Sequence, residues 1–115
     1  MAARGGLENQ SYPWGNEVPT CNMDMITGTN FSGCNSNDAF PIMSFLPNGF
    51  GLYDMAGNVG EWVDNLGHVS GDGYFIRGGS WLSNSSQITI EAISYSSDGI
   101  HGYVDTGFRC ARSAP

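Results

Sequence analysis

The chain has 115 residues, of which 40% are hydrophobic and 12% aromatic, which is enough for one small domain with a buried core. It carries four arginines and no lysine, and its net charge is -7. Because phosphate backbones and anionic surfaces attract clustered Lys and Arg, this charge excludes nucleic acid and membrane surfaces as expected partners. The apolar runs are shorter than a membrane-spanning helix, and the first residues show no signal-peptide pattern.

Residues 15–40 form a long polar stretch, rich in Asn and without any periodic pattern. A compact domain orders such a stretch only through function or a bound ion. Cys21 and Cys34 both lie in this region. These two cysteines can form a disulfide in an oxidising compartment. The absence of a secretion signal favours reduced thiols instead. His68 and His101 stand alone and there is no Cys-x-x-Cys, so the sequence predicts no zinc site.

Residues 51–62 read Gly-Leu-Tyr-Asp-Met-Ala-Gly-Asn-Val-Gly-Glu-Trp. Asp54 and Glu61 therefore flank a glycine-containing turn, with the backbone carbonyls of Gly57 and Val59 between them. Two carboxylates and free carbonyls are the ligands that calcium requires. By itself, however, the spacing favours an ordinary tight turn in which Asp54 bonds to the backbone and Glu61 is solvated.

Strand-like runs follow this turn, while no window has a sustained helical period. Short strands are predicted at 59–63, 74–81, 87–95 and 107–111, because apolar residues alternate or cluster there between Gly-rich and Asn-rich turns. The sequence thus predicts a loop-dominated α+β fold with a small antiparallel sheet and little helix.

Seven short blocks carry a family resemblance. They are Ala-Ala-Arg-Gly-Gly at 2–6, Tyr-Pro-Trp-Gly-Asn at 12–16, Cys-Asn-Met at 21–23, Pro-Asn-Gly-Phe-Gly-Leu-Tyr-Asp at 47–54, Gly-Asn-Val at 57–59 with Glu-Trp at 61–62, Arg-Gly-Gly-Ser-Trp at 77–81 and Gly-Phe-Arg at 107–109. In this order they resemble the formylglycine-generating enzyme, or sulfatase-modifying factor, family, whose fold is an elaborated C-type-lectin-like domain.

The resemblance covers residues 1–115 as one partial domain, because the family's N-terminal half has no counterpart here. It therefore implies exposed apolar surface. We expect this surface to lead to self-association or to pairing with a complementing chain.

The resemblance also implies structural calcium. Family members hold one ion at the positions of Asp54, Gly57, Val59 and Glu61, the outer two through side chains and the inner two through carbonyls. A second family site corresponds to the Asn22 side chain and the Met23 carbonyl, with further ligands from a loop that falls at 34–38.

The family's oxidases bind copper through two cysteines, and soft thiolates are the ligands that suit a cuprous ion. Those positions are Ser83 and Ile88 in this chain. Ser80 matches a family serine near the oxygen pocket, whereas Gly60 replaces the family's usual aromatic residue. We therefore expect no copper and no catalysis. Cys110 matches a family cysteine whose partner position is Ala3, so it is expected to be a buried free thiol.

A ligand-binding role is the alternative. Residues 83–106 are rich in Ser, include Tyr, Asn and Gly, and contain no Lys or Arg, a composition that adaptable binding surfaces use. In retroelement-diversified proteins of the same lectin-like fold, this segment is the variable face. The predicted groove for a protein or peptide ligand consists of Ser80, Trp81, Ser83, Asn84, Tyr95 and Tyr103.

Four further side chains are given structural roles. We expect Arg77 and Arg109 to position strand ends by pairing with nearby aspartates, namely Asp64, Asp72 or Asp105. Trp62 and Trp81 are expected to be core anchors, each with a partner for its indole N–H.

Overall fold

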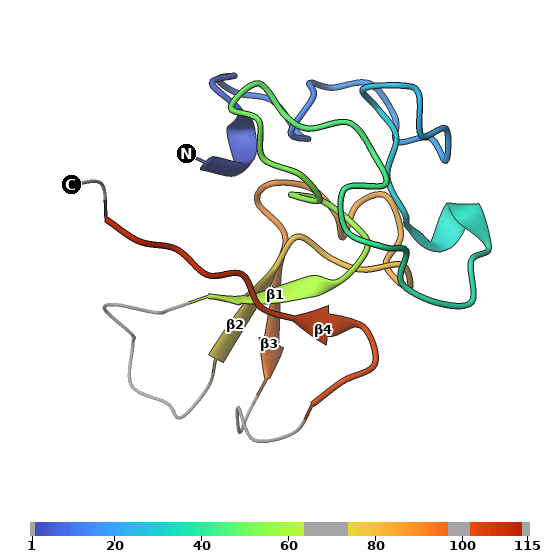
Figure 1. The fold of residues 1–115 in the computed structure, drawn as a ribbon, viewed down its shortest axis with the longest axis vertical. Helices are drawn as coiled ribbons and strands as arrows, with labels where there is room; N and C mark the ends of the chain where they lie inside the picture. The colour runs from blue at the N-terminus through green and yellow to red at the C-terminus, as the bar shows by residue number, and fades with distance from the viewer. Residues whose placement is uncertain (1, 64–73, 97–101, 114–115) are drawn as a thin grey trace.

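A computed structural model of the protein describes residues 2–63, 74–96 and 102–113 (Figure 1). Four strands form one sheet in the order β3-β2-β1-β4. Their bounds are Gly60–Val63 for β1, Tyr74–Arg77 for β2, Ile93–Ser96 for β3 and Thr106–Gly107 for β4. The helical elements in these residues are two 3-10 turns, η1 at Ala2–Arg4 and η2 at Ser32–Cys34. The predicted loop-rich fold with a small sheet and little helix is confirmed.

The sheet is mixed, which corrects the expectation that it is antiparallel. β1 pairs antiparallel with β2, with Trp62 opposite Ile76, and β2 pairs antiparallel with β3. β4, by contrast, runs parallel to β1, with Glu61 opposite Gly107. A parallel partner needs a long connection rather than a hairpin, and the whole of β2 and β3 lies between these two strands in the chain. The sequence pattern of each strand carries no signal for this choice.

The predicted strand bounds are right at β1 and too long elsewhere. β2 ends at Arg77 because Gly78 and Gly79 have φ angles of 90° and 65°, a left-handed conformation that ends an extended strand. In the predicted strand 87–95 only the last residues pair, and Ile88 instead lies in a turn with none of its surface exposed. Of 107–111, only Gly107 belongs to a strand.

Most of residues 2–59 form a layer of loops on one side of the sheet (Figure 1). Its core is small. Tyr12, Ala56 and Ile88 are buried together, with Trp14 and Phe31 packed against them. The rings of Tyr12 and Trp14 stack with centroids 5.1 Å apart. With so little apolar packing, the loops depend on polar contacts for their order.

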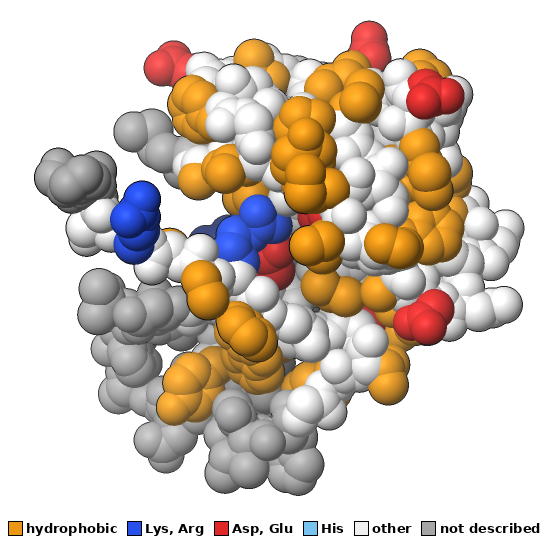
Figure 2. All heavy atoms as spheres, in the orientation of Figure 1, with side chains coloured by type: hydrophobic (Ala, Val, Ile, Leu, Met, Phe, Trp, Pro, Cys, Tyr) orange, Lys and Arg blue, Asp and Glu red, His pale blue; other side chains and the backbone are white. Residues whose placement is uncertain are grey.

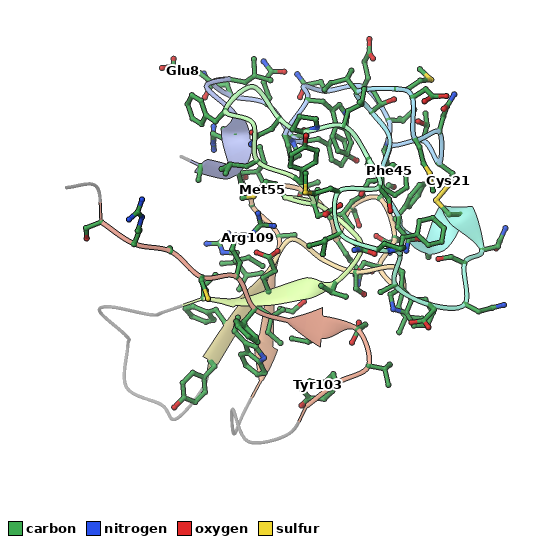
Figure 3. The ribbon with its side chains drawn as sticks, viewed as in Figure 1. Glu8, Cys21, Phe45, Met55, Tyr103 and Arg109 are labelled. Carbon is green, nitrogen blue, oxygen red and sulfur yellow. A yellow bond between two sulfur atoms is a disulfide. The ribbon has the colours of Figure 1, made fainter. Side chains whose placement is uncertain are left out.

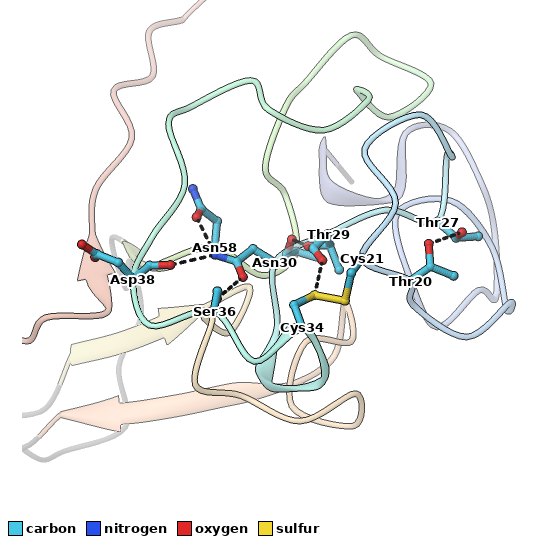
Figure 4. The surroundings of a disulfide bond; sticks show 10 residues. Thr20, Cys21, Thr27, Thr29, Asn30, Cys34, Ser36, Asp38 and Asn58 are labelled. Atoms are coloured by element: carbon cyan, nitrogen blue, oxygen red, sulfur yellow. Dashed lines mark hydrogen bonds between the residues drawn. A yellow bond between two sulfur atoms is a disulfide. The ribbon is translucent and has the colours of Figure 1, made fainter.

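Asn58 makes five of these contacts, of which Figure 4 draws the one with the Asn30 side chain. Its side-chain oxygen accepts the backbone N–H of Phe40 at 2.8 Å, and its amide nitrogen donates to the Phe40 carbonyl at 3.1 Å. Its own backbone N–H donates to the Asn30 carbonyl at 2.7 Å, and its carbonyl accepts from Trp81 at 2.9 Å. Asn58 has 4% of its surface exposed and a φ of 67°. It therefore joins three distant segments immediately before β1.

Asn30 continues this network. None of its surface is exposed, and its side chain donates to the Asp38 carbonyl at 3.1 Å and accepts from the Ser36 hydroxyl at 2.6 Å. The amides of Asn30 and Asn58 lie 3.4 Å apart. Buried amides satisfied in this way order a polar segment that has no periodic pattern of its own.

Cys21 and Cys34 form a disulfide, with their Cα atoms 5.5 Å apart (Figure 4). This corrects the preference for reduced thiols. The thiol of the third cysteine, Cys110, is free as predicted, but the residue is exposed rather than buried. The disulfide cross-links the two ends of the segment 21–34 within the loop layer.

Apolar side chains are exposed over the loop layer, as the space-filling view shows (Figure 2). Ile42 is 80% exposed, Phe50 59% and Met43 57%. The predicted self-association or complementing chain stays a prediction. Among the described residues, no helix has the length and apolar character needed to cross a membrane.

Replacing Asn58 with Ala is expected to lower the free energy of unfolding by about 2 kcal/mol, because it leaves both partly buried backbone groups of Phe40 without their partner. Urea unfolding followed by tryptophan fluorescence measures the effect. Asn37→Ala is the matched control, since Asn37 is exposed. Equal urea midpoints for the two variants would contradict the role given to Asn58.

Reducing the disulfide, or replacing Cys21 and Cys34 with Ser, is expected to lower the free energy of unfolding by about 3 kcal/mol. The unfolded chain gains conformational entropy when a cross-link that closes a loop of this size is lost. The two cysteines are separated by 13 positions. Thermal unfolding with and without reductant checks this. Cys110→Ser should leave the melting temperature unchanged, and a loss as large as that of the double variant would refute the assignment.

Candidate functional site

The acidic turn and β1 meet the chain after β4 through Arg109. Its guanidinium donates from Nε to Glu61 Oε2 at 2.8 Å and from Nη2 to Glu61 Oε1 at 2.6 Å. Nη2 also lies 2.9 Å from the Tyr53 carbonyl and 3.3 Å from that of Asp54. Figure 3 shows Arg109 between the sheet and the loop layer. The turn thus directs several oxygen atoms at one positive charge.

The hydrogen bonds with Glu61 raise the pKa of Arg109 above its ordinary value, partial burial opposes this, and the negative charges of Glu61 and Asp54 add to the rise. Arg109 is therefore a permanent cation in the turn. The expected partner of Arg109 was an aspartate, and the observed one is Glu61. Arg77 likewise donates to backbone carbonyls, those of Ile90 at 3.3 Å and Glu91 at 3.5 Å. Asp64 and Asp72 lie outside the described residues, as do His68 and His101.

The predicted first calcium site has its oxygen donors on one continuous turn. Asp54 has a φ of 54°, and its Oδ2 accepts the Met43 N–H at 2.8 Å. Within the described residues, no hydrogen bond reaches the carbonyls of Gly57 and Val59. Both carboxylates have partners, yet a carboxylate has lone pairs for more than one. The donor set fits a hard cation in chemistry, although the described part of the chain holds no cluster of three His, Cys, Asp or Glu.

The predicted second calcium site is less complete. The Asn22 side-chain oxygen accepts the Asp24 N–H at 2.9 Å, and the Asn22 carbonyl accepts from Met25 at 3.2 Å. Met23 is 43% exposed. The disulfide holds this segment beside Cys34, where the segment 34–38 begins. The oxygen atoms of Asn22, however, accept hydrogen bonds from residues of its own turn.

A pocket of about 250 Å³ lies between the sheet and the turn before β4. It brings together Ser80, Ser83 and Tyr103 from the predicted groove. Gly60, Ile76, Gly79, Ser94, Asp105 and Thr106 complete its lining. The Ser80 hydroxyl donates to Asp105 Oδ2 at 2.7 Å, and the Ser80 N–H donates to the Ser83 hydroxyl at 2.9 Å. The pocket is thus a hydroxyl-rich site around one carboxylate.

The other groove residues lie elsewhere. Trp81 does not line this pocket. Asn84 is exposed, and its side-chain oxygen caps its own turn by accepting the N–H groups of Ser86 at 3.0 Å and Gln87 at 3.1 Å. Tyr95 belongs to β3, where its backbone faces Phe75, but its side chain lies outside what the structure describes.

The tryptophans are weaker anchors than expected. Trp62 and Trp81 are only half-buried. The Trp62 ring packs edge-on against Tyr74, with centroids 6.1 Å apart. The Trp81 indole nitrogen is buried without a hydrogen-bond partner among the described residues, which corrects the prediction that it has one.

The positions that would carry the copper cysteines hold groups with other roles. Ser83 is half-buried, and its hydroxyl accepts the Ser80 N–H. Ile88 is completely buried in the core of the loop layer. The three cysteines of the chain are accounted for by the disulfide and the exposed Cys110. None of them lines the pocket.

Sequence reasoning did not identify Asp105 as a pocket residue. Its contact with Ser80 spans 25 positions, and no local pattern encodes such a distance. The one available signal was Gly60, a glycine inside a predicted strand, which often marks a place where another group approaches closely.

A family model described as the sulfatase-modifying factor enzyme 1-like domain matches residues 1–114. The inactive C-alpha-formylglycine-generating enzyme 2 of Mus musculus is 35% identical over 99% of this chain and 40% of its own length. The formylglycine-generating enzyme of Thermomonospora curvata is 33% identical over 96% of this chain and 46% of its own. The chain thus spans less than half the length of these relatives.

Solved structures agree on the fold. One titled Treponema denticola variable protein 1 superposes with a TM-score of 0.74 at 25% identity, covering 93% of this chain and 42% of that one. PvdO from Pseudomonas aeruginosa superposes with a TM-score of 0.68 at 24% identity, covering 93% and 46%. The chain belongs to the sulfatase-modifying factor, or formylglycine-generating enzyme, family.

Proposed function

We propose that this chain is a non-catalytic, ligand-binding member of the family, stabilised by calcium. The observation that carries the proposal is the chemistry at Ser83 and Ile88. A cuprous site needs soft ligands such as thiolates. Here one position offers a hydroxyl already bonded to Ser80, and the other is a buried aliphatic side chain. What remains is a pocket of hydroxyls and one carboxylate, which can bind a ligand but has no group that exchanges electrons.

The names of the relatives are compatible with both a catalytic and a non-catalytic role. The mouse relative is named inactive, whereas the Thermomonospora curvata relative, of similar identity, carries the name of the enzyme alone. Overall similarity therefore does not separate the two classes. The non-catalytic role is supported instead by the side chains at Ser83 and Ile88.

The test is oxygen uptake by the purified chain with copper, a reductant and a cysteine-containing sulfatase peptide. We expect no uptake above a copper-only blank and no aldehyde in the peptide by mass spectrometry, because no thiolate pair can hold the metal. The Thermomonospora curvata relative serves as the positive control. Copper-dependent uptake with aldehyde formation would overturn the proposal.

Calcium would be held by the carboxylates of Asp54 and Glu61 with the carbonyls of Gly57 and Val59. Support comes from the carbonyls of Gly57 and Val59, which accept no hydrogen bond among the described residues. The ion would share or compete for the Glu61 carboxylate, which Arg109 already contacts. When bound, the ion would supply a charge that ties the turn to the start of β1. Asn22 and Met23 are proposed for the second ion on the weaker ground that the disulfide places them beside Cys34.

Calcium at about one hundred times its dissociation constant is expected to stabilise the chain by about 2.7 kcal/mol, seen as a rise in melting temperature over a chelator-treated sample. Asp54→Ala should abolish most of this rise, whatever it does to the baseline. Glu8→Ala, an exposed carboxylate, should keep it. An equal rise in both variants, or none in the unmodified chain, would count against the first site.

A second candidate function is the display of a protein-binding face by residues 83–106. It is favoured by the superposition on a structure titled a variable protein, and by the exposure of Val104, at 81%, and of Asn84 to Ser86. A protein ligand held by these side chains would still bind a variant whose pocket is blocked by Ser94→Trp. Loss of such a ligand on blocking the pocket would contradict this candidate.

A further inference from the structure

We propose that the pocket binds the primary ammonium group of a small amine, with Asp105 as its counter-ion. The inference rests on the proposed function, in that the pocket is taken as a binding site and not a catalytic one. It names the chemical class of the ligand, which neither the family nor the fold supplies.

The pocket exists because β1 begins with a glycine. A Cβ atom at Gly60 would lie 2.7 Å from Ile76 Cγ2, 3.7 Å from the Asp105 carbonyl and 3.8 Å from Thr106 Oγ1. All three residues line the pocket. Any side chain at this position would therefore extend against the pocket walls, so the hollow depends on its absence.

The lining decides the charge of the ligand. Its described lining contains the hydroxyls of Ser80, Ser83, Ser94, Tyr103 and Thr106 and the carboxylate of Asp105, and none of these described residues is Lys, Arg or His. An anionic ligand would meet the Asp105 carboxylate without a compensating cation among these residues. A primary ammonium group has three N–H donors. It can bond to the carboxylate and to hydroxyl oxygens together, and hydrogen bonds between two charged groups are the strong ones.

Asp105 is held in place for this role. Its Oδ2 accepts the hydroxyl of Ser80, which is only 2% exposed, at 2.7 Å, and its carbonyl accepts the Gly60 N–H at 2.7 Å. A counter-ion fixed from two sides loses little conformational entropy on binding. The net charge of -7 adds a field that draws cations toward the chain.

The size of the pocket limits the ligand. Its volume of about 250 Å³ is below the usual range for drug-sized molecules. A four-carbon diamine or the end of a lysine side chain is the scale that it suits. Tyr103, which lines the pocket and is 47% exposed, lies at the end of the sheet away from the loop layer (Figure 3).

Isothermal titration of the purified chain with 1,4-diaminobutane and with 1,4-butanediol tests the inference. The two compounds share a carbon chain, and only the first is cationic. We expect the diamine to bind at low ionic strength, with an affinity at least about tenfold above that of the diol, because a charge-assisted bond is lost in the diol. Equal binding of the two, or no binding of the diamine, overturns the inference.

Asp105→Asn is expected to weaken diamine binding by at least about tenfold, since it removes the charge and keeps an oxygen for Ser80. Glu8→Gln removes the same charge on the distant loop layer (Figure 3). It should change the affinity for the diamine less than twofold, because salt screens the interaction between distant exposed charges. Ser94→Trp fills the pocket from an exposed position on β3 and should abolish binding, which covers the case in which Asp105→Asn unfolds. Equal effects of Asp105→Asn and Glu8→Gln, or retained binding in Ser94→Trp, overturn the inference.

The ammonium group could belong to a free amine or to a lysine. An acetylated and amidated Gly-Lys-Gly peptide, titrated in parallel, distinguishes these sources, and tighter binding of either one supports the shared chemistry. If neither the diamine nor the peptide binds and copper-dependent oxygen uptake is also absent, the amine inference is overturned and the proposed function still holds. Oxygen uptake would overturn the proposed function itself.

Discussion

The side chain of Asn58 is the constraint on which the loop layer depends. It satisfies both backbone groups of Phe40 and contacts the amide of Asn30, while its own backbone bonds to Asn30 and Trp81. No apolar side chain could replace the contacts of the Asn58 side chain, because they end on buried or partly buried polar groups that would otherwise lack a partner. The cost of a left-handed φ at a non-glycine residue is about 1 kcal/mol, which this number of bonds exceeds.

A fold held in this way needs less apolar core than one built of helices. The buried apolar residues that the structure describes are Tyr12, Phe45, Ala56, Ile76 and Ile88. Around them the chain turns repeatedly, and five described non-glycine residues have positive φ angles. The disulfide adds a covalent restraint between Cys21 and Cys34, the two ends of a polar segment. Polar networks and one cross-link therefore give the order that periodic packing gives elsewhere.

The sequence could predict what is local or repeated across a family. The glycine-rich blocks around residues 57–62 contributed to the family resemblance, and the short strand predicted at 59–63 agrees with β1 to within one residue. What it could not predict were contacts between distant segments. Glu61 meets Arg109 across 48 positions, and an aspartate was the expected partner because acidic residues are common in this chain. The parallel pairing of β4 could likewise not be predicted, because a strand of two residues is too short for its sequence to indicate a direction.

The start of β1 joins the two features that matter most for function. Neighbouring residues on a strand point to opposite faces. Accordingly, the missing side chain at Gly60 opens the pocket on one face, and Glu61 meets Arg109 on the other. β4 makes the same connection from the other side, because Asp105 lines the pocket just before it and Arg109 follows just after it. A cation at the acidic turn would thus fix the same pair of strands that position Asp105. The geometry of the turn and that of the pocket therefore both depend on one short piece of parallel sheet, the pairing of β1 with β4.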